Sequence, residues 1–283
     1  MEKKFFEKPT IYVGEVNINV TNLEKALNFY QSIIGFSVLE QTDSKAVLTA
    51  DGTTPLLTLE QPADVVPKED RKTGLFHFAI LLPSRADLSS FLNHIVQTGT
   101  RLGASDHYVS EALYLSDPDG NGIEVYRDRP SSEWNWTDGK VAMATEPLDG
   151  ESLLAESKKE WNGLPNETVM GHIHLHVANL AETEKFYKNG LGFDIVTTYP
   201  GALFTSTGDY HHHIGLNVWN GEGAKAPSRN SAGMNWFTLV YPNKKVREET
   251  ISQLKQVGAD VKQESDYYTT QDPSGNTIQL ILN

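Results

Sequence analysis

The sequence predicts an α+β fold in which four copies of a β-α-β-β-β module form two paired-module domains. The first observation is a gapless internal repeat, because residues 14–36 (GEVNINVTNLEKALNFYQSIIGF) align with residues 171–193 (GHIHLHVANLAETEKFYKNGLGF). The second is a recurring turn sequence, DPDGNGIE at 117–124 and DPSGNTIQ at 272–279. The third is that a strand, a helix and short strands follow one another twice within each half. Such a duplication decides the architecture, since each copy forms the same supersecondary unit.

The first module shows the pattern of elements clearly. Alternating residues at 15–20 (EVNINV) predict a strand, and Asn22 is a suitable N-cap for the helix that follows. Apolar residues then recur at helical spacing from Leu23 to Ile34, and Gly35 is expected to end the helix. Three short β-type runs complete the module, at 36–41, 45–50 and 55–60.

The same order of elements recurs along the rest of the chain. The third module begins at residue 172 and the fourth at residue 234. The expected elements of the second module are a strand at 75–82, a helix at 85–98, and strands at 101–107, 111–116 and 121–127.

Residues 129–167 interrupt the repeat between modules 2 and 3. This segment contains Pro130, Pro147, Pro165, Trp134 and Trp136, and one helix-like stretch near 151–160. We interpret it as an ordered linker, with an extension that follows the protein surface as the alternative. It separates modules 1 and 2, at 1–128, from modules 3 and 4, at 168–283.

Composition excludes several classes of function. The chain has 24 Lys+Arg and 37 Asp+Glu residues, a net charge of −13, so its surface repels nucleic-acid backbones. No stretch approaches the roughly 20 apolar residues of a membrane span, and the start lacks the pattern of a signal peptide. We therefore expect a cytoplasmic protein without a nucleic-acid or membrane partner. There is no cysteine, so any metal must be held by His, Asp or Glu.

Residues that could carry chemistry gather in modules 2 and 3. In GHIHLHV, His172, His174 and His176 alternate and must point to one face of a strand. A single strand histidine is more often a packing residue than a ligand, but a core face would not select imidazole three times. The other candidates are His77, His107, Tyr114 and Glu124 in module 2, and the run of His211, His212 and His213 in module 3.

The repeat supplies an internal control for these candidates. When module 4 is aligned with module 2, the positions of His77, His107, Tyr114 and Glu124 hold Trp236, Lys262, Thr269 and Gln279. In module 1, the positions of His172, His174 and His176 hold Glu15, Asn17 and Asn19. The fold therefore does not need the polar residues of modules 2 and 3, and we expect the chemistry to lie in those two modules.

The modules and their helices, with the pattern L-x-x-x-x-x-F-Y followed by G-F, resemble the vicinal oxygen chelate superfamily of glyoxalases, fosfomycin-resistance proteins and extradiol dioxygenases. A more specific motif resembles the extradiol ring-cleaving dioxygenases. It consists of His107, five residues, Leu113-Tyr114, two residues, Asp117-Pro118-Asp119-Gly120, three residues and Glu124. Only Ser105 departs from it, where that family usually has a glycine or another small or apolar residue. Within the family, GHIHLHV and YHHHIGLN are most similar to the catechol-2,3-dioxygenases of bacilli.

The order of the modules departs from this family. In typical two-domain members the motif belongs to the last module, whereas here module 2 carries it. We therefore expect module 2 to pair with module 3, and module 1 with module 4. This pairing predicts one catalytic cup in which His77, Glu124 and His172 meet, while sequential pairing would leave each domain an incomplete set.

The resemblance implies a function for each candidate. His77, Glu124 and His172 would bind Fe(2+), with Mn(2+) as the alternative, and the substrates would be catechol or a substituted catechol together with O2. The ring would be cleaved beside the diol to give a 2-hydroxymuconic semialdehyde, a step of aromatic hydrocarbon catabolism. His212 would act as the acid/base, with His213 as the alternative. Tyr114 and His107 would hydrogen-bond the diol or the ring-opening intermediate, and His174 would line the substrate pocket.

A second function remains open at this stage. A glyoxalase-like, non-redox metalloenzyme of the same superfamily, an isomerase or a thiol transferase, would use a similar cup with Zn, Mn or Ni. A homo-oligomer is compatible with either function.

Overall fold

Two eight-stranded sheets form the framework of the protein, and the predicted α+β class with paired βαβββ modules is confirmed. The computed structural model describes residues 3–282. The first sheet holds the strands of modules 1 and 4, in the order β16 (Val261–Gln263), β17 (Tyr268–Gln271), β18 (Thr277–Leu282), β15 (Gly233–Tyr241), β1 (Tyr12–Asn19), β4 (Leu57–Glu60), β3 (Lys45–Thr49) and β2 (Ser37–Gln41).

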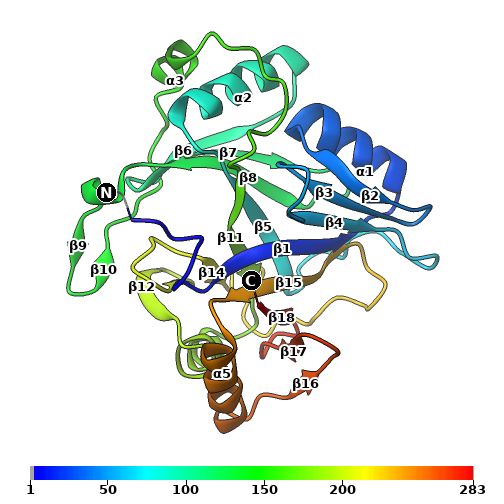
Figure 1. The fold of residues 1–283 in the computed structure, drawn as a ribbon, viewed down its shortest axis with the longest axis vertical. Coiled ribbons are helices and arrows are strands. Elements are labelled where there is room, and N and C mark those ends of the chain that lie inside the picture. Colours follow the sequence, from blue (N-terminus) through cyan, green and yellow to red (C-terminus); the bar gives the residue numbers. More distant parts are fainter. Residues whose placement is uncertain (1–2, 283) are drawn as a thin grey trace.

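The second sheet holds the strands of modules 3 and 2. Their order is β12 (Asp194–Tyr199), β13 (Ala202–Ser206), β14 (Ile214–Asn217), β11 (Val169–His176), β5 (Gly74–Leu81), β8 (Gly122–Asp128), β7 (Ser110–Ser116) and β6 (Gly103–Asp106). The modules are joined through their first strands, because β11 pairs with β5 and β1 with β15, both antiparallel. In Figure 1 these two pairs lie next to each other in the middle of the molecule.

Each module packs one helical segment against its strands. The helices are α1 (Leu23–Phe29), which continues as a π-helical turn (Tyr30–Ile34), α2 (Arg85–Thr98), α4 (Leu180–Glu184), which continues as a second π-helical turn (Lys185–Gly190), and α5 (Lys244–Gln256). The expected N-cap is confirmed, because the Asn22 side chain accepts a hydrogen bond from the Lys25 amide. Gly35 ends the segment with a φ of 99°, which glycine adopts without steric cost.

A buried hydrogen bond explains why the two halves share both a tyrosine in the first helix and an aspartate in the Asp-Pro turn. The Tyr30 hydroxyl donates to Asp117 Oδ2 at 2.9 Å, and the Tyr187 hydroxyl donates to Asp272 Oδ2 at 3.1 Å. In each half, the bond fastens the helix of one module to the turn of the next. These repeated residues therefore serve the fold.

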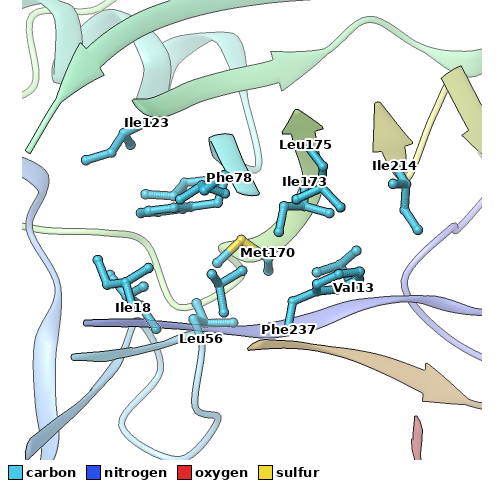
Figure 2. Close-up of a cluster of buried hydrophobic side chains, with 14 of the residues drawn as sticks. Val13, Ile18, Leu56, Phe78, Ile123, Met170, Ile173, Leu175, Ile214 and Phe237 are labelled. Carbon is cyan, nitrogen blue, oxygen red and sulfur yellow. The ribbon is translucent and has the colours of Figure 1, made fainter. Parts of the chain in front are cut away.

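The hydrophobic core lies between the two sheets. Figure 2 shows Val13 and Phe237 of one sheet facing Ile173, Leu175 and their neighbours on the other. Because residues alternate along a strand, the histidines of β11 must point away from this core. The chemistry-bearing face of the second sheet is thus the face that the core does not use.

The segment 129–167 packs mainly on module 2, and its hairpin also contacts β12 of module 3. It contains a 3-10 turn (Ser131–Glu133), a small hairpin of β9 (Trp136–Thr137) and β10 (Lys140–Val141), and helix α3 (Gly150–Glu156). The helix predicted near 151–160 is shorter than expected, and α3 packs on α2 through an ion pair of Arg85 with Glu156 (2.7 Å). Between residues 3 and 282, no helix has both the length and the apolar character needed to cross a membrane.

Candidate metal centre

The middle strands of the second sheet bring the candidate ligands together. Ala79 on β5 is the cross-strand partner of both His172 on β11 and Glu124 on β8. His77 lies two residues before Ala79 and therefore on the same face of β5. Because Ala79 carries only a methyl group, space remains above it for the three longer side chains around it.

One ligand atom from each of His77, Glu124 and His172 lies within 4.8 Å of the other two. Glu124 Oε2 is 3.1 Å from His77 Nε2 and 3.1 Å from His172 Nε2. All three side chains are buried, with at most 6% of each residue exposed. Within the part of the chain that the structure describes, this is the one group of three such residues close enough to share an ion.

These three residues fit a divalent metal. His77 Nε2 is buried and has no hydrogen-bond partner, although it lies near Glu124. A buried polar atom without a partner is costly, and a bound cation would satisfy it. Two imidazoles and one carboxylate are also the donor set typical of non-haem Fe(II) sites.

The electrostatics of the group favour a charged Glu124 and a neutral His172. Burial alone would raise the pKa of Glu124, but His172 and His77 outweigh it and hold that pKa well below its usual value. Burial lowers the pKa of His172 to about 4, despite the opposing effect of Glu124. An ionised carboxylate and an unprotonated imidazole are the forms that bind metals, so Glu124 and His172 are in their metal-binding forms near neutral pH.

The three residues lie at the wall of a cavity of about 400 Å³. This volume is within the range of roughly 300–1,000 Å³ that is usual for small-molecule pockets. The other lining residues are Phe76, Ser105, His107, Tyr114, Met143, Ala144, Thr145, His174, Tyr199, Pro200, Phe204, His212 and Trp219. The cavity therefore combines aromatic walls with a few convergent polar groups, and it contains His107, Tyr114, His174 and His212 from the predicted set.

His107 and Tyr114 form a fixed pair on one side of the cavity. The Ala144 carbonyl lies 2.6 Å from His107 Nδ1 and can only accept, so Nδ1 carries the proton. His107 Nε2 then accepts from the Tyr114 hydroxyl at 2.5 Å. Burial, followed by the nearby Glu124 charge, raises the pKa of Tyr114 well above its usual value. Tyr114 thus stays protonated and directs its proton to His107.

His174 is oriented by an amide. Asn217 Nδ2 donates to His174 Nε2 at 3.0 Å, while Asn217 Oδ1 accepts from His176 Nδ1 at 2.8 Å. Burial and the neighbouring His77 and His172 lower the pKa of His174 well below its usual value. His174 is therefore a neutral, fixed part of the cavity wall.

The structure separates the two histidines that the sequence left as alternatives for the acid/base. His212 lines the cavity, with its ring centroid 4.1 Å from that of His172. His213 is fully buried and does not line the cavity, and its Nε2 lies 3.3 Å from the Phe5 carbonyl oxygen. His212 but not His213 is thus among the residues that line this cavity. The three histidines also precede the strand, since β14 begins at Ile214, so strand alternation could not choose between them.

Several cavity residues were missed at the sequence level. Phe76 precedes His77, and alternation would place it on the opposite face, but the pairing of β5 with β11 shifts register between His77 and Leu75. Such a bulge re-aims a side chain, and the Phe76 ring lies 5.0 Å from that of His77. Met143 and its neighbours come from the linker, whose sequence carries no signal for this contact. For Phe204 and Trp219, the only signal in the sequence is the general tendency of aromatic side chains to line pockets.

Among residues 3–282, the sheet of modules 1 and 4 has no equivalent centre. Glu15, at the position of His172, accepts a hydrogen bond from the Thr58 hydroxyl at 2.5 Å. Burial raises the pKa of Glu15 above its usual value. Trp236 and Gln279 stand where the second sheet has His77 and Glu124. In the cup of modules 1 and 4, the described residues thus form no group of three possible metal ligands, as the internal control from the sequence indicates.

Comparisons with known proteins agree with this architecture. The model of the glyoxalase/bleomycin resistance protein/dioxygenase superfamily matches residues 12–125 and 169–280. Catechol-2,3-dioxygenase of Bacillus subtilis (strain 168) is 46% identical over 277 residues, which cover 96% of this chain and 97% of that protein. The metallothiol transferase FosB of Lysinibacillus sphaericus is 23% identical over 117 residues, 40% of this chain and 80% of that protein. The crystal structure of glyoxalase I from Zea mays covers 96% of this chain and 92% of its own, with a TM-score of 0.59 and 17% identity, a likeness of fold alone.

Proposed function

The chain belongs to the glyoxalase/bleomycin resistance protein/dioxygenase superfamily, and from this premise we propose that it is an extradiol catechol dioxygenase. It would add O2 to catechol or a substituted catechol and open the ring beside the diol, giving a 2-hydroxymuconic semialdehyde. The observation that carries the proposal is the buried group of His77, Glu124 and His172 beside a cavity with aromatic walls. The 46% identity to a catechol-2,3-dioxygenase over almost the whole of both chains supports it.

The proposed metal is Fe(II), with Mn(II) as the alternative. His77 Nε2, His172 Nε2 and one oxygen of Glu124 would hold it, and such a site keeps positions open for reactants. When bound there, Fe(II) supplies the electron transfer that couples a vicinal diol to O2. The three residues are buried, and electrostatic interactions in such surroundings are stronger than in water.

The side chains around the site bind and orient the substrate. The Phe204 and Trp219 rings flank His174, with centroids 5.4 and 5.3 Å away, and offer flat surfaces to an aromatic ring. Because the Tyr114 hydroxyl donates its hydrogen bond to His107, the Tyr114 oxygen can still accept a hydrogen bond from a substrate hydroxyl. These contacts would fix the diol toward the metal.

The reaction also needs a group that takes one phenolic proton and later returns it. His212 suits this task, because it lines the cavity beside His172 and is not among the proposed ligands. Burial, with the neighbouring histidines, lowers the pKa of His212 well below its usual value, so the ring is neutral and able to accept a proton.

The test is to load the full-length protein with Fe(II) under anaerobic conditions and add catechol or simple alkylcatechols in the presence of O2. We expect oxygen uptake and a yellow ring-fission product in equal amounts. If the iron-loaded protein consumes no oxygen and forms no such product, the proposal is wrong. A non-redox metalloenzyme of the superfamily would bind metal but leave both readings at background.

A further inference from the structure

A chain of hydrogen bonds leads from the cavity residue His212 to Asp128 at the end of β8. His212 Nδ1 lies 2.8 Å from His211 Nδ1, and His211 Nε2 lies 2.8 Å from Asp128 Oδ1. Both nitrogens of His211 are therefore engaged, as is one nitrogen of His212. The nitrogen of His212 that remains for a reactant in the cavity is Nε2.

The middle of this chain is rigidly held. His211 is fully buried, and its ring packs against those of Tyr210 (4.1 Å between centroids) and Trp134 (5.1 Å). The second oxygen of Asp128 accepts from the Tyr210 hydroxyl at 3.0 Å, and that hydroxyl lies 2.7 Å from the hydroxyl of Tyr126. Neither Asp128 nor His211 can turn without breaking one of these contacts.

The chemistry of the end group gives the chain a direction. A carboxylate only accepts hydrogen bonds, so His211 must carry a proton on Nε2 to bond to Asp128. A neutral His211 then has a lone pair on Nδ1, which can only accept from His212 Nδ1–H. This leaves His212 with an unprotonated Nε2, since the position of the ring proton is fixed by the bond that the other nitrogen makes.

We propose that Asp128 and His211 are positioning residues that hold His212 in its Nδ1–H tautomer, so that Nε2 faces the cavity as the proton acceptor. The catalytic part of this inference rests on the proposed function, because it concerns the phenolic proton of a diol. Its structural part, the tautomer, does not depend on any activity. An oriented imidazole of the wrong tautomer would offer a proton where the reaction needs a lone pair.

The opposite arrangement is chemically possible and defines the contrary outcome. If His211 carried protons on both nitrogens, it would donate from Nδ1 to His212 Nδ1. The proton of His212 would then lie on Nε2.

The first experiment is NMR of the full-length protein labelled with ¹⁵N at histidine, with diamagnetic Zn(II) in the site, and with His212→Gln used to assign the signals. We expect His212 to show a protonated Nδ1 and an unprotonated Nε2. A His212 signal with the proton on Nε2 overturns the inference. The measurement needs no turnover, so it gives its answer even if the protein proves not to be a dioxygenase.

The second experiment replaces Asp128 by Asn, whose amide can donate to His211 Nε2 and reverse the chain. In the Fe(II)-loaded enzyme we expect kcat for catechol to fall by roughly 100-fold, the low end of what general acid/base groups contribute, with little change in KM. The NMR signal of His212 should shift to the Nε2–H form. Tyr210→Phe is the matched control, because it removes the other bond to Asp128 and should leave the His212 tautomer unchanged. An unchanged tautomer and unchanged kcat in Asp128→Asn would contradict the proposed role.

Discussion

His77 Nε2 lies 3.1 Å from Glu124 Oε2, yet His77 Nε2 makes no hydrogen bond. The carboxylate oxygen is shared with His172 Nε2, also at 3.1 Å, so two imidazoles converge on one anion. Burying two imidazole nitrogens and a carboxylate together costs desolvation free energy unless another interaction compensates for it. A metal ion between the three atoms would turn the orphaned nitrogen into a ligand.

The first prediction concerns Glu124→Gln. This change removes the only negative charge of the three proposed ligands while keeping the size of the side chain. We expect the affinity for Fe(II) or Zn(II) to fall by more than about 100-fold, because losing an outer-shell partner alone typically costs 10–100-fold. Metal content after dialysis and calorimetric titration measure the effect.

The control for this variant is supplied by the repeat. Gln279→Glu places a carboxylate at the matching position of module 4, where Trp236 stands in place of a histidine. It should leave the metal content unchanged. Metal loss in Gln279→Glu together with normal binding in Glu124→Gln would show that the proposed ligand set is wrong.

The sequence predicted the parts of the site that depend on strand periodicity. His172 and His174 share a face because they alternate along β11. Module 4 has Trp236 and Gln279 at the positions of His77 and Glu124, so the repeat indicated that these two residues are not needed for the fold. Phe76 could not be predicted, because a bulge between β5 and β11 has no local signature in the sequence. Nor could Met143, since its place in the cavity depends on how the linker packs. Register and long-range packing are thus what the sequence pattern leaves undetermined.

The second prediction concerns stability against acid. Burial lowers the pKa of His213 to about 3, whereas an unfolded histidine titrates near 6.5. Between these two values the unfolded chain binds more protons than the folded one, so the free energy of unfolding must fall as pH falls from about 6.5 toward 3. Through this one group, the free energy of unfolding should fall by about 2 kcal/mol between pH 7 and pH 5.

Urea unfolding of the metal-free protein at several pH values measures this loss. His213→Gln removes the titrating ring outside the cavity, so its stability should depend less steeply on pH than that of the wild type. If the two proteins lose stability in parallel between pH 7 and pH 5, His213 is not a source of the acid sensitivity.

The third prediction concerns Tyr114→Phe. The variant removes the hydroxyl that bonds to His107 Nε2 and that we expect to contact the diol. A hydrogen bond between uncharged groups contributes roughly 0.5–1.5 kcal/mol, so kcat/KM for catechol should fall by about 2- to 10-fold. Iron content should stay at the wild-type level, because Tyr114 is not among the proposed ligands. Thr269→Val, at the equivalent position of module 4, should leave both quantities unchanged.

The fourth prediction concerns Gly215, which lies beside His174 on the neighbouring strand β14. A Cβ at Gly215 would be 2.8 Å from Cγ and 2.9 Å from Cδ2 of His174, closer than real side-chain contacts permit. His174 is also held by Asn217, two residues further along β14, and lies 5.1 Å, between ring centroids, from His77. Gly215→Ala should therefore push the His174 ring into the cavity toward the ligand His77.

We expect Gly215→Ala to raise KM for catechol by at least about 10-fold, which corresponds to about 1.4 kcal/mol of lost substrate binding. Steady-state kinetics of the Fe(II)-loaded enzyme measure it, with Gly150→Ala as the control because a Cβ at Gly150 meets nothing within 4 Å. Because His174 is not among the proposed ligands, the larger effect should fall on substrate affinity, with metal content reduced less. A Gly215→Ala enzyme with wild-type KM would mean that the position of His174 does not define the substrate pocket.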